Sequence, residues 1–299
     1  MLLWLTDTHF NFLRKGNISF SPVRIFGEYL MAENPSAEGL IITGDISTGE
    51  SIVTHLREFA EGFTKPIFFV LGNHDFYDST FTAVEAQVSG AIAMYKDNGI
   101  TNLHWLNDGF YEHDDHLIVG VGGWYDAYHG NQNSPVLISD FHFIKDLRPG
   151  LRHSTILLSL VRERAKKEAD VLASMLRAAC KKPNKNVIVC THVAPYPEAS
   201  WHEGAISNRD FLPWFSSAST GAVLDVYSRK FPEKNFVVLV GHSHSPGIFR
   251  KHDNVVVYTG KAVYGAPDLA GVINTKEKII SCYNHLMNKV EINYENPTV

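Results

Sequence analysis

Short apolar runs of four or five residues recur along the chain, and each is followed by glycine or polar residues. Uninterrupted apolar runs of this length are typical of strands that are buried on both faces of a sheet. We therefore expect buried strands at residues 2–5, 39–42, 67–71, 187–190 and 236–240.

Between these runs, apolar residues return at the spacing of a helix face. We expect helices at residues 22–34, 51–63, 81–98, 154–181 and about 221–229, with Pro22 in the first turn of the earliest one. Residues 11–21 have no such period and are expected to form a loop. Alternation of strands and helices predicts a largely parallel sheet with helices on its faces.

The pattern changes in the middle of the chain. A strand expected at residues 117–125 runs into a glycine-rich turn, and a polar loop and one long helix then fill residues 126–186. We interpret 126–186 as a helical insertion or cap within a single domain, 1–299. Residues 255–258 and 271–283 are expected to be closing strands. A chain of 299 residues with 44% hydrophobic content can bury a core of that size.

Metal-binding residue types gather directly after the predicted strands. The clusters are Asp7-Thr8-His9, Gly44-Asp45, Gly72-Asn73-His74-Asp75, His192 and Gly241-His242-Ser243-His244. Strand ends are where open α/β sheets place ligands, and carboxylates, imidazoles and an amide suit divalent ions. A carboxylate such as Asp45 can bridge two ions. Two ions with Asp7 and Asp45 leave a positive site that attracts phosphate, although the chain has a net charge of −5.

Each cluster alone also has a purely structural reading. Gly44-Asp45 is common turn chemistry, Gly72-Asn73 suits a tight turn, and most of the 15 histidines are expected to be ordinary core or surface residues. The conjunction of all five clusters, in this order and after predicted strands, favours a metal site.

The ordered blocks D-x-H, G-D, G-N-H-(D/E), H and G-H-x-H resemble the signature of the calcineurin-like metallophosphoesterases. The resemblance implies an α/β fold, a four-layer α/β/β/α sandwich of two mixed sheets flanked by helices. It also implies a binuclear metal-dependent phosphoesterase, in which a metal-bridging hydroxide attacks a small phosphomonoester or phosphodiester, a nucleotide being one candidate.

The resemblance further implies a role for each residue of the blocks. Asp7, His9 and His244 would hold one metal, Asn73, His192 and His242 the other, and Asp45 would bridge them. His74 would be the catalytic acid, oriented by Asp75 or by a backbone carbonyl. Manganese is the expected metal, with iron, zinc and nickel as alternatives.

Substrate selectivity is expected to come from loops around the metals. We expect Trp124, Tyr125, Tyr196, His153 and Arg209 to contact the substrate. Aromatic side chains in these loops could stack on a base or sugar, or could simply pack against the protein. Further candidates in the same loops are Asp126, Tyr128, Arg152, Trp201 and His202.

Three other functions have less support, of which the nuclease and the scaffold stay open as alternatives. A Ser/Thr protein phosphatase is disfavoured, because Thr48 and Gly49 stand where that branch has Asp and Arg. A nuclease of the same superfamily would need a basic groove, and a pI near 6.3 argues against extended nucleic-acid binding. A non-catalytic scaffold on the same fold should have lost a ligand, and none is missing.

The spacing of the cysteines and the hydropathy of the chain indicate the cellular compartment in which the protein works. Cys180, Cys190 and Cys282 lack paired spacing, so we expect neither a disulfide framework nor a structural zinc site. The chain shows no leader-like start and no apolar run of about 18 residues. We expect a cytoplasmic enzyme with a small phosphate-ester substrate and no membrane partner; the oligomeric state is left open.

Overall fold

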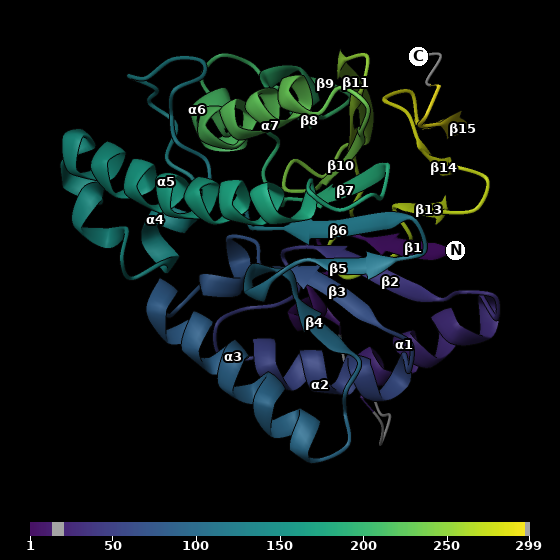
Figure 1. Ribbon diagram of the computed structural model, residues 1–299. Coiled ribbons are helices and arrows are strands. Elements are labelled where there is room, and N and C mark those ends of the chain that lie inside the picture. The colour runs from purple at the N-terminus through teal and green to yellow at the C-terminus, as the bar shows by residue number, and fades with distance from the viewer. Residues whose placement is uncertain (14–20, 297–299) are drawn as a thin grey trace.

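Two large mixed sheets lie face to face in the computed structural model, which describes residues 1–13 and 21–296 (Figure 1). The first sheet has the strand order β15-β14-β13-β1-β2-β3-β4. Its parallel half comprises β1 (Leu2–Leu5), β2 (Gly39–Thr43), β3 (Ile67–Val70) and β4 (Leu103–Trp105). Its antiparallel half comprises β13 (Gly271–Asn274), β14 (Ile279–Tyr283) and β15 (Lys289–Asn293).

The second sheet has the order β11-β12-β10-β7-β6-β5. Its four inner strands are parallel: β6 (His116–Gly120), β7 (Asn186–Cys190), β10 (Asn235–Val240) and β12 (Val255–Thr259). The edge strands β5 (Tyr111–His113) and β11 (Gly247–His252) are antiparallel to their neighbours. A separate small hairpin joins β8 (Trp201–His202) to β9 (Ala205–Ile206).

Helices cover the outer face of each sheet (Figure 1). The first sheet is covered by α1 (Pro22–Glu33), α2 (Ile52–Gly62) and α3 (Phe81–Asp97), and the second by α5 (Ser154–Ala179) and α7 (Ala218–Lys230). The Ser21 hydroxyl accepts a bond from the Arg24 amide and Pro22 fills the first turn, which fixes where α1 begins. The layer order α/β/β/α confirms the predicted fold class.

Shorter helical segments connect these elements. They are α4 (Asp140–Phe143), α6 (Leu212–Phe215) and the 3₁₀ turns η1 (Phe10–Phe12), η2 (His74–Phe76), η3 (Leu106–Asp108), η4 (Arg148–Arg152) and η5 (Pro197–Ala199). Two of these turns, η1 and η2, directly follow candidate site residues.

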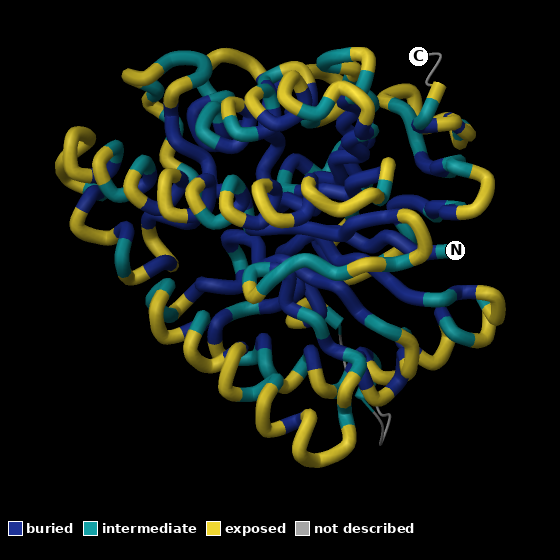
Figure 2. The backbone as a smooth tube through the Cα atoms, viewed as in Figure 1, coloured by how far each residue is buried: buried dark blue, intermediate teal, exposed yellow. Residues whose placement is uncertain are grey.

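Strand β1 shows why its residues are apolar on both faces. Leu3 and Leu5 point towards the helices α1 and α2, whereas Leu2 and Trp4 point into the layer between the sheets. Figure 2 shows the same arrangement as a buried centre enclosed by exposed helices and loops. Burial on both faces fixes the strand register, and the register fixes the position of the residues that follow each strand.

The predicted strands and helices are confirmed, and most of their ends differ by a few residues at most. The strand expected at 117–125 is shorter than predicted and ends at Gly120. Strands β1 to β4 of the first sheet and β6, β7, β10 and β12 of the second are parallel, as predicted from the strand and helix alternation. The remaining strands, β13 to β15, β5 and β11, are antiparallel to their neighbours and make both sheets mixed. Strands β4, β5, β11 and β15 were not predicted, because they are short or alternate weakly. Of the loop expected at residues 11–21, residues 14–20 lie outside the described residues.

Within residues 126–186, the structure separates two parts. Helix α5 lies on the second sheet, where Leu172 and Leu176 are buried together with Leu117 and Val187. It therefore belongs to the outer helix layer, and the segment nearer the strand ends is the loop that carries α4. The single domain with an insertion stays a prediction. No helix among residues 1–13 and 21–296 is long and apolar enough to cross a membrane.

Candidate metal centre

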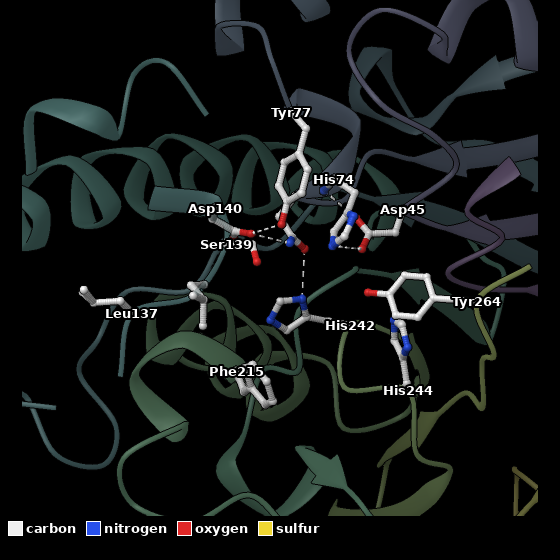
Figure 3. A pocket seen from close by; sticks show the side chains of 12 residues that line it. Asp45, His74, Tyr77, Leu137, Ser139, Asp140, Phe215, His242, His244 and Tyr264 are labelled. Carbon is white, nitrogen blue, oxygen red and sulfur yellow. Dashed lines mark hydrogen bonds and ion pairs between the residues drawn. The ribbon is translucent and has the colours of Figure 1, made fainter. Parts of the chain in front are cut away.

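The candidate ligands converge at one edge where both sheets end. Asp7 and His9 follow β1, Asp45 follows β2, and Asn73 follows β3. His192 follows β7, and His242 and His244 follow β10 of the second sheet. Figure 3 shows Asp45, His74, His242 and His244 around one cavity. The site is complete only when the two sheets are stacked.

Four side chains form the first half of this cluster. The ligand atoms of Asp7, His9, Asp45 and His244 all lie within 4.8 Å of one another. The Nε2 atom of His244 lies 3.3 Å from Asp7 Oδ1 and 3.3 Å from His9 Nε2. Such converging oxygen and nitrogen atoms are the donor set of a divalent ion.

The second half is organised around the amide oxygen of Asn73. This Oδ1 atom lies 2.9 Å from His192 Nε2 and 2.9 Å from His242 Nδ1. Asp45 joins the two halves, because its Oδ1 is 3.3 Å from His192 Nε2 and its Oδ2 is 3.7 Å from His9 Nε2. A carboxylate between two donor groups is placed as a bridge would be.

Backbone carbonyls hold two of the imidazoles by their outer nitrogens. His192 Nδ1 lies 2.8 Å from the Thr43 carbonyl oxygen, and His242 Nε2 lies 2.9 Å from that of Trp214. A ring nitrogen that donates outwards leaves the opposite nitrogen free to bind a metal. Metal-binding histidines typically have such an anchor.

The electrostatics of the cluster suit a cation. Burial alone would raise the pKa of Asp7, but His244 and His192 outweigh it and lower that pKa to about 2. Burial would lower the pKa of His192, but Asp45 and Asp7 raise it to about 10. Burial lowers the pKa of His9 to about 4. Among the described residues, histidines are the only ion-pair partners of the buried Asp7 and Asp45 carboxylates, so the donor set fits divalent ions.

The backbone of the site is held in an unusual conformation. Asp7, His9, Asp45, His242 and His244 all have positive φ, between 42° and 69°. Left-handed geometry costs energy for residues other than glycine and is concentrated at functional sites. These strand-end turns aim the side chains at a common point.

Two glycines of the sequence blocks allow close approach. A Cβ atom at Gly72 would lie 2.2 Å from Asp45 Oδ1, and one at Gly241 would lie 2.2 Å from Asp7 Oδ2. No side chain fits at either position without moving a carboxylate. Close packing against a carboxylate therefore explains why the G-N-H and G-H-x-H blocks have glycine at these positions.

Asp140 is a site residue that the sequence interpretation missed. This buried carboxylate accepts hydrogen bonds from Asn73 Nδ2 at 2.8 Å, Tyr77 at 2.7 Å and Tyr125 at 2.8 Å. Figure 3 shows Asp140 beside Tyr77 at the cavity. By accepting from Nδ2, it turns the Asn73 oxygen towards His192 and His242. A lone Asp in a polar loop, 67 residues after its partner, gives no sequence signal.

His74 lies beside the cluster with its ring over the cavity. Its Nε2 is 3.8 Å from Asp45 Oδ2, its ring stacks on Tyr77 at 4.2 Å, and its amide donates to Asp45 Oδ1. The side chain of Asp75 does not orient it. Asp75 instead accepts from the amides of Ser47 and Gly72, and thereby joins the two neighbouring loops.

The predicted substrate contacts lie elsewhere. Trp124, Tyr125 and Tyr196 are buried and pack within the protein, and Tyr196 donates to Asp225. His153 and Arg209 are exposed. None of these five lines the cavity at the cluster. For the three aromatic residues the reason is their size, because a large aromatic side chain stabilises the protein more when it is packed in the core than when it faces solvent.

The other substrate candidates of these loops also lie outside the cavity lining. Asp126 is buried and accepts from the amides of Tyr128 and Ser219. Trp201 stacks on His285 at 4.7 Å, and His202 packs beside Phe215. These contacts are local to the loops.

Comparison with known proteins agrees with this geometry. Residues 2–246 match the family model described as calcineurin-like phosphoesterase. The chain resembles a phosphopantetheinyl hydrolase from Mycobacterium tuberculosis, with a TM-score of 0.60 and 15% identity over 88% of this chain and 89% of that one. It also resembles a dimetal phosphatase from Danio rerio, with a TM-score of 0.58 and 13% identity over 98% of both chains.

Identities this low support the fold alone, and no curated protein sequence matches the chain. The family model, however, spans most of the sequence and includes every candidate ligand. The chain belongs to the calcineurin-like phosphoesterase family.

Proposed function

We propose that the protein is a binuclear metallophosphoesterase that hydrolyses a small phosphomonoester or phosphodiester, a nucleotide being one candidate. The observation that carries the proposal is the convergence of seven ligand-type side chains, from five strand ends of two sheets, beside His74. A structural role alone gives no reason to gather these residues at one cavity.

The two halves of the cluster divide the ligands. Asp7, His9 and His244 would hold one ion, and Asn73, His192 and His242 the other, with Asp45 between them. Bound divalent ions would supply Lewis acidity and an activated water for hydrolysis. Manganese is the proposed metal, with iron, zinc and nickel as alternatives that this donor set also accepts.

His74 is the proposed acid. It lies at the cavity with its side chain 17% exposed, close enough to Asp45 to face a phosphate bound at the cluster. A proton held on its imidazole would pass to the leaving oxygen of the ester, and histidine is the side chain that most often performs such general acid catalysis.

The competing functions have less support. A non-catalytic scaffold would not need all seven ligand positions with their carbonyl anchors. A nuclease would need a basic groove, and no lysine or arginine is among the described residues that line the cavity. A cytoplasmic location is part of the proposal and agrees with three free cysteines.

The test is reconstitution of the purified protein with each metal, followed by a screen of nucleotides, cyclic nucleotides, phosphomonoesters and diesters. Asp45→Asn should bind less metal and lose most turnover, whereas His74→Ala should keep both metals and lose rate. Asp253→Asn, at a fully exposed carboxylate, is the matched control and should behave as wild type. A metal-loaded enzyme that turns over no phosphate ester would refute the proposal.

A further inference from the structure

The cavity at the cluster has a polar floor and apolar walls. Four candidate ligands, Asp45, Asn73, His242 and His244, line its floor together with His74. Leu137, Phe215 and Tyr264 stand around it (Figure 3). Phe215 packs edge-on against His242 at 5.0 Å, and Tyr264 lies 4.4 Å from His9 and 4.8 Å from His244. The apolar groups therefore begin directly beside the reacting centre.

Large apolar side chains continue from these walls to the surface. Leu137 is 60% exposed, Tyr264 49%, Phe12 48% and Phe143 44%. Phe12 packs on Tyr264 at 5.0 Å, and Phe143 packs on Tyr77 at 5.2 Å. Apolar residues gathered at the rim of a cavity, rather than scattered singly, mark a surface that a ligand covers.

The charge of the walls excludes a second charged group. Of the described residues that line the cavity, none is lysine or arginine, and Asp140 adds a further carboxylate. A second phosphate or a carboxylate on the substrate would lose its hydration here without gaining a lysine or arginine partner, because His74 faces the phosphoryl group that is hydrolysed. The phosphoryl group itself belongs at the ligand cluster.

The cavity is also small. Its volume of about 230 Å³ is below the range of about 300–1,000 Å³ that is usual for ligand pockets. It accommodates a phosphoryl group and a short alcohol, and a longer apolar chain would extend over Leu137 and Tyr264 at the rim.

We propose that the substrate is the phosphate ester of an uncharged, apolar alcohol, and that Leu137, Phe215 and Tyr264 determine this specificity. The inference rests on the proposed phosphoesterase function. The walls cover the leaving alcohol and remove its apolar surface from water, while polar and polyphosphorylated alcohols gain nothing from them.

The first experiment compares hexyl phosphate, glycerol 3-phosphate and ADP with the manganese-loaded enzyme. The first two are primary alkyl monoesters, so their chemical reactivity is similar and the leaving alcohol is what differs. We expect kcat/KM for hexyl phosphate to exceed that for glycerol 3-phosphate by at least about tenfold, with ADP lower still. Equal values, or a preference for ADP, would overturn the inference while leaving the phosphoesterase function intact. No turnover of these three substrates or of any monoester or diester in the wider screen would instead reject the function.

The second experiment tests whether Leu137 causes the preference for the apolar alcohol. Leu137→Ser should lower the ratio of kcat/KM for hexyl phosphate to kcat/KM for glycerol 3-phosphate about threefold to tenfold. Leu286→Ser is the matched control, because Leu286 is 67% exposed and does not line the cavity. If both variants keep the wild-type ratio, Leu137 does not contact the alcohol and the assignment of the wall is wrong.

Discussion

Replacing Asp140 tests whether the Asn73 amide is held in place from outside the ligand cluster. In the structure, Asn73 Nδ2 donates to Asp140 Oδ1 at 2.8 Å, and the opposite Oδ1 then faces His192 and His242. Asp140→Ala removes the acceptor and lets the amide rotate. A rotated amide would present an NH₂ group, which cannot bind a metal.

The structure gives the expected magnitude. Asp140 accepts three hydrogen bonds, from Asn73, Tyr77 and Tyr125, and only the first reaches a candidate ligand. Loss of a group that orients a ligand typically weakens metal binding about 10-fold to 100-fold. At about 1.4 kcal/mol per tenfold, this is about 1.4–2.8 kcal/mol for the ion at Asn73. The ion at Asp7, His9 and His244 should bind nearly as before.

Calorimetric titration of the metal-free variants with Mn²⁺ measures both sites. Asp140→Asn should recover most of the affinity, because its carbonyl oxygen can still accept from Asn73 while its NH₂ group donates to Tyr125. Tyr125→Phe is the control, since it removes a bond to Asp140 Oδ2 and leaves the Asn73 bond unchanged. An Asp140→Ala protein that binds two ions as tightly as wild type would refute this reasoning.

Three further variants test other parts of the structure. Gly241→Ala places a methyl group against the Asp7 carboxylate, so the purified protein should contain less metal; wild-type metal content would contradict the close approach. Arg164→Ala removes the partner of buried Glu168, which lies 2.7 Å away, and should lower the free energy of unfolding in urea by about 3–5 kcal/mol; a change below 1 kcal/mol would show that the pair contributes little. Burial lowers the pKa of His116 to about 4, whereas an unfolded histidine titrates near 6.5. Between these values the unfolded chain binds a proton that the folded chain does not, so stability should fall by up to about 3 kcal/mol as the pH drops from about 6.5 to about 4. His116→Gln should flatten this slope, and equal slopes for variant and wild type would count against it.

The candidate ligands were predictable because their positions follow from strand burial. Strands β1, β2, β3, β7 and β10 are apolar on both faces, so their limits are visible in the sequence. The residues directly after them are then brought to the same edge by parallel pairing. Asp7 and Asp45 are close in space for this reason, although they are far apart in the chain, and the stacking of the second sheet brings His192 to them.

The walls of the cavity were not predictable in the same way. Leu137 and Tyr264 lie in loops without a repeating pattern, and their approach to the cluster depends on contacts made only in the folded chain. Trp124 and Tyr196, which were expected to meet substrate, are instead buried. Aromatic residues near a site look the same in sequence whether they face the cavity or the core.

Hydrogen bonds between the two sheets make the site part of what holds the fold together. The amide of His242, after β10, donates to the Asp7 carboxylate at 3.0 Å, and His192, after β7, contacts the Thr43 carbonyl of β2 at 2.8 Å. An ion held between Asp7 and His244, and one held between Asn73 and His192, would each cross the same boundary, and they would bind the stacked sheets but not the separated ones. Their binding free energy therefore adds to the packing of Trp4 and its apolar neighbours between the sheets. The packing of the inter-sheet core and the contacts within the ligand cluster together compensate the energetic cost of the positive φ angles at the strand ends.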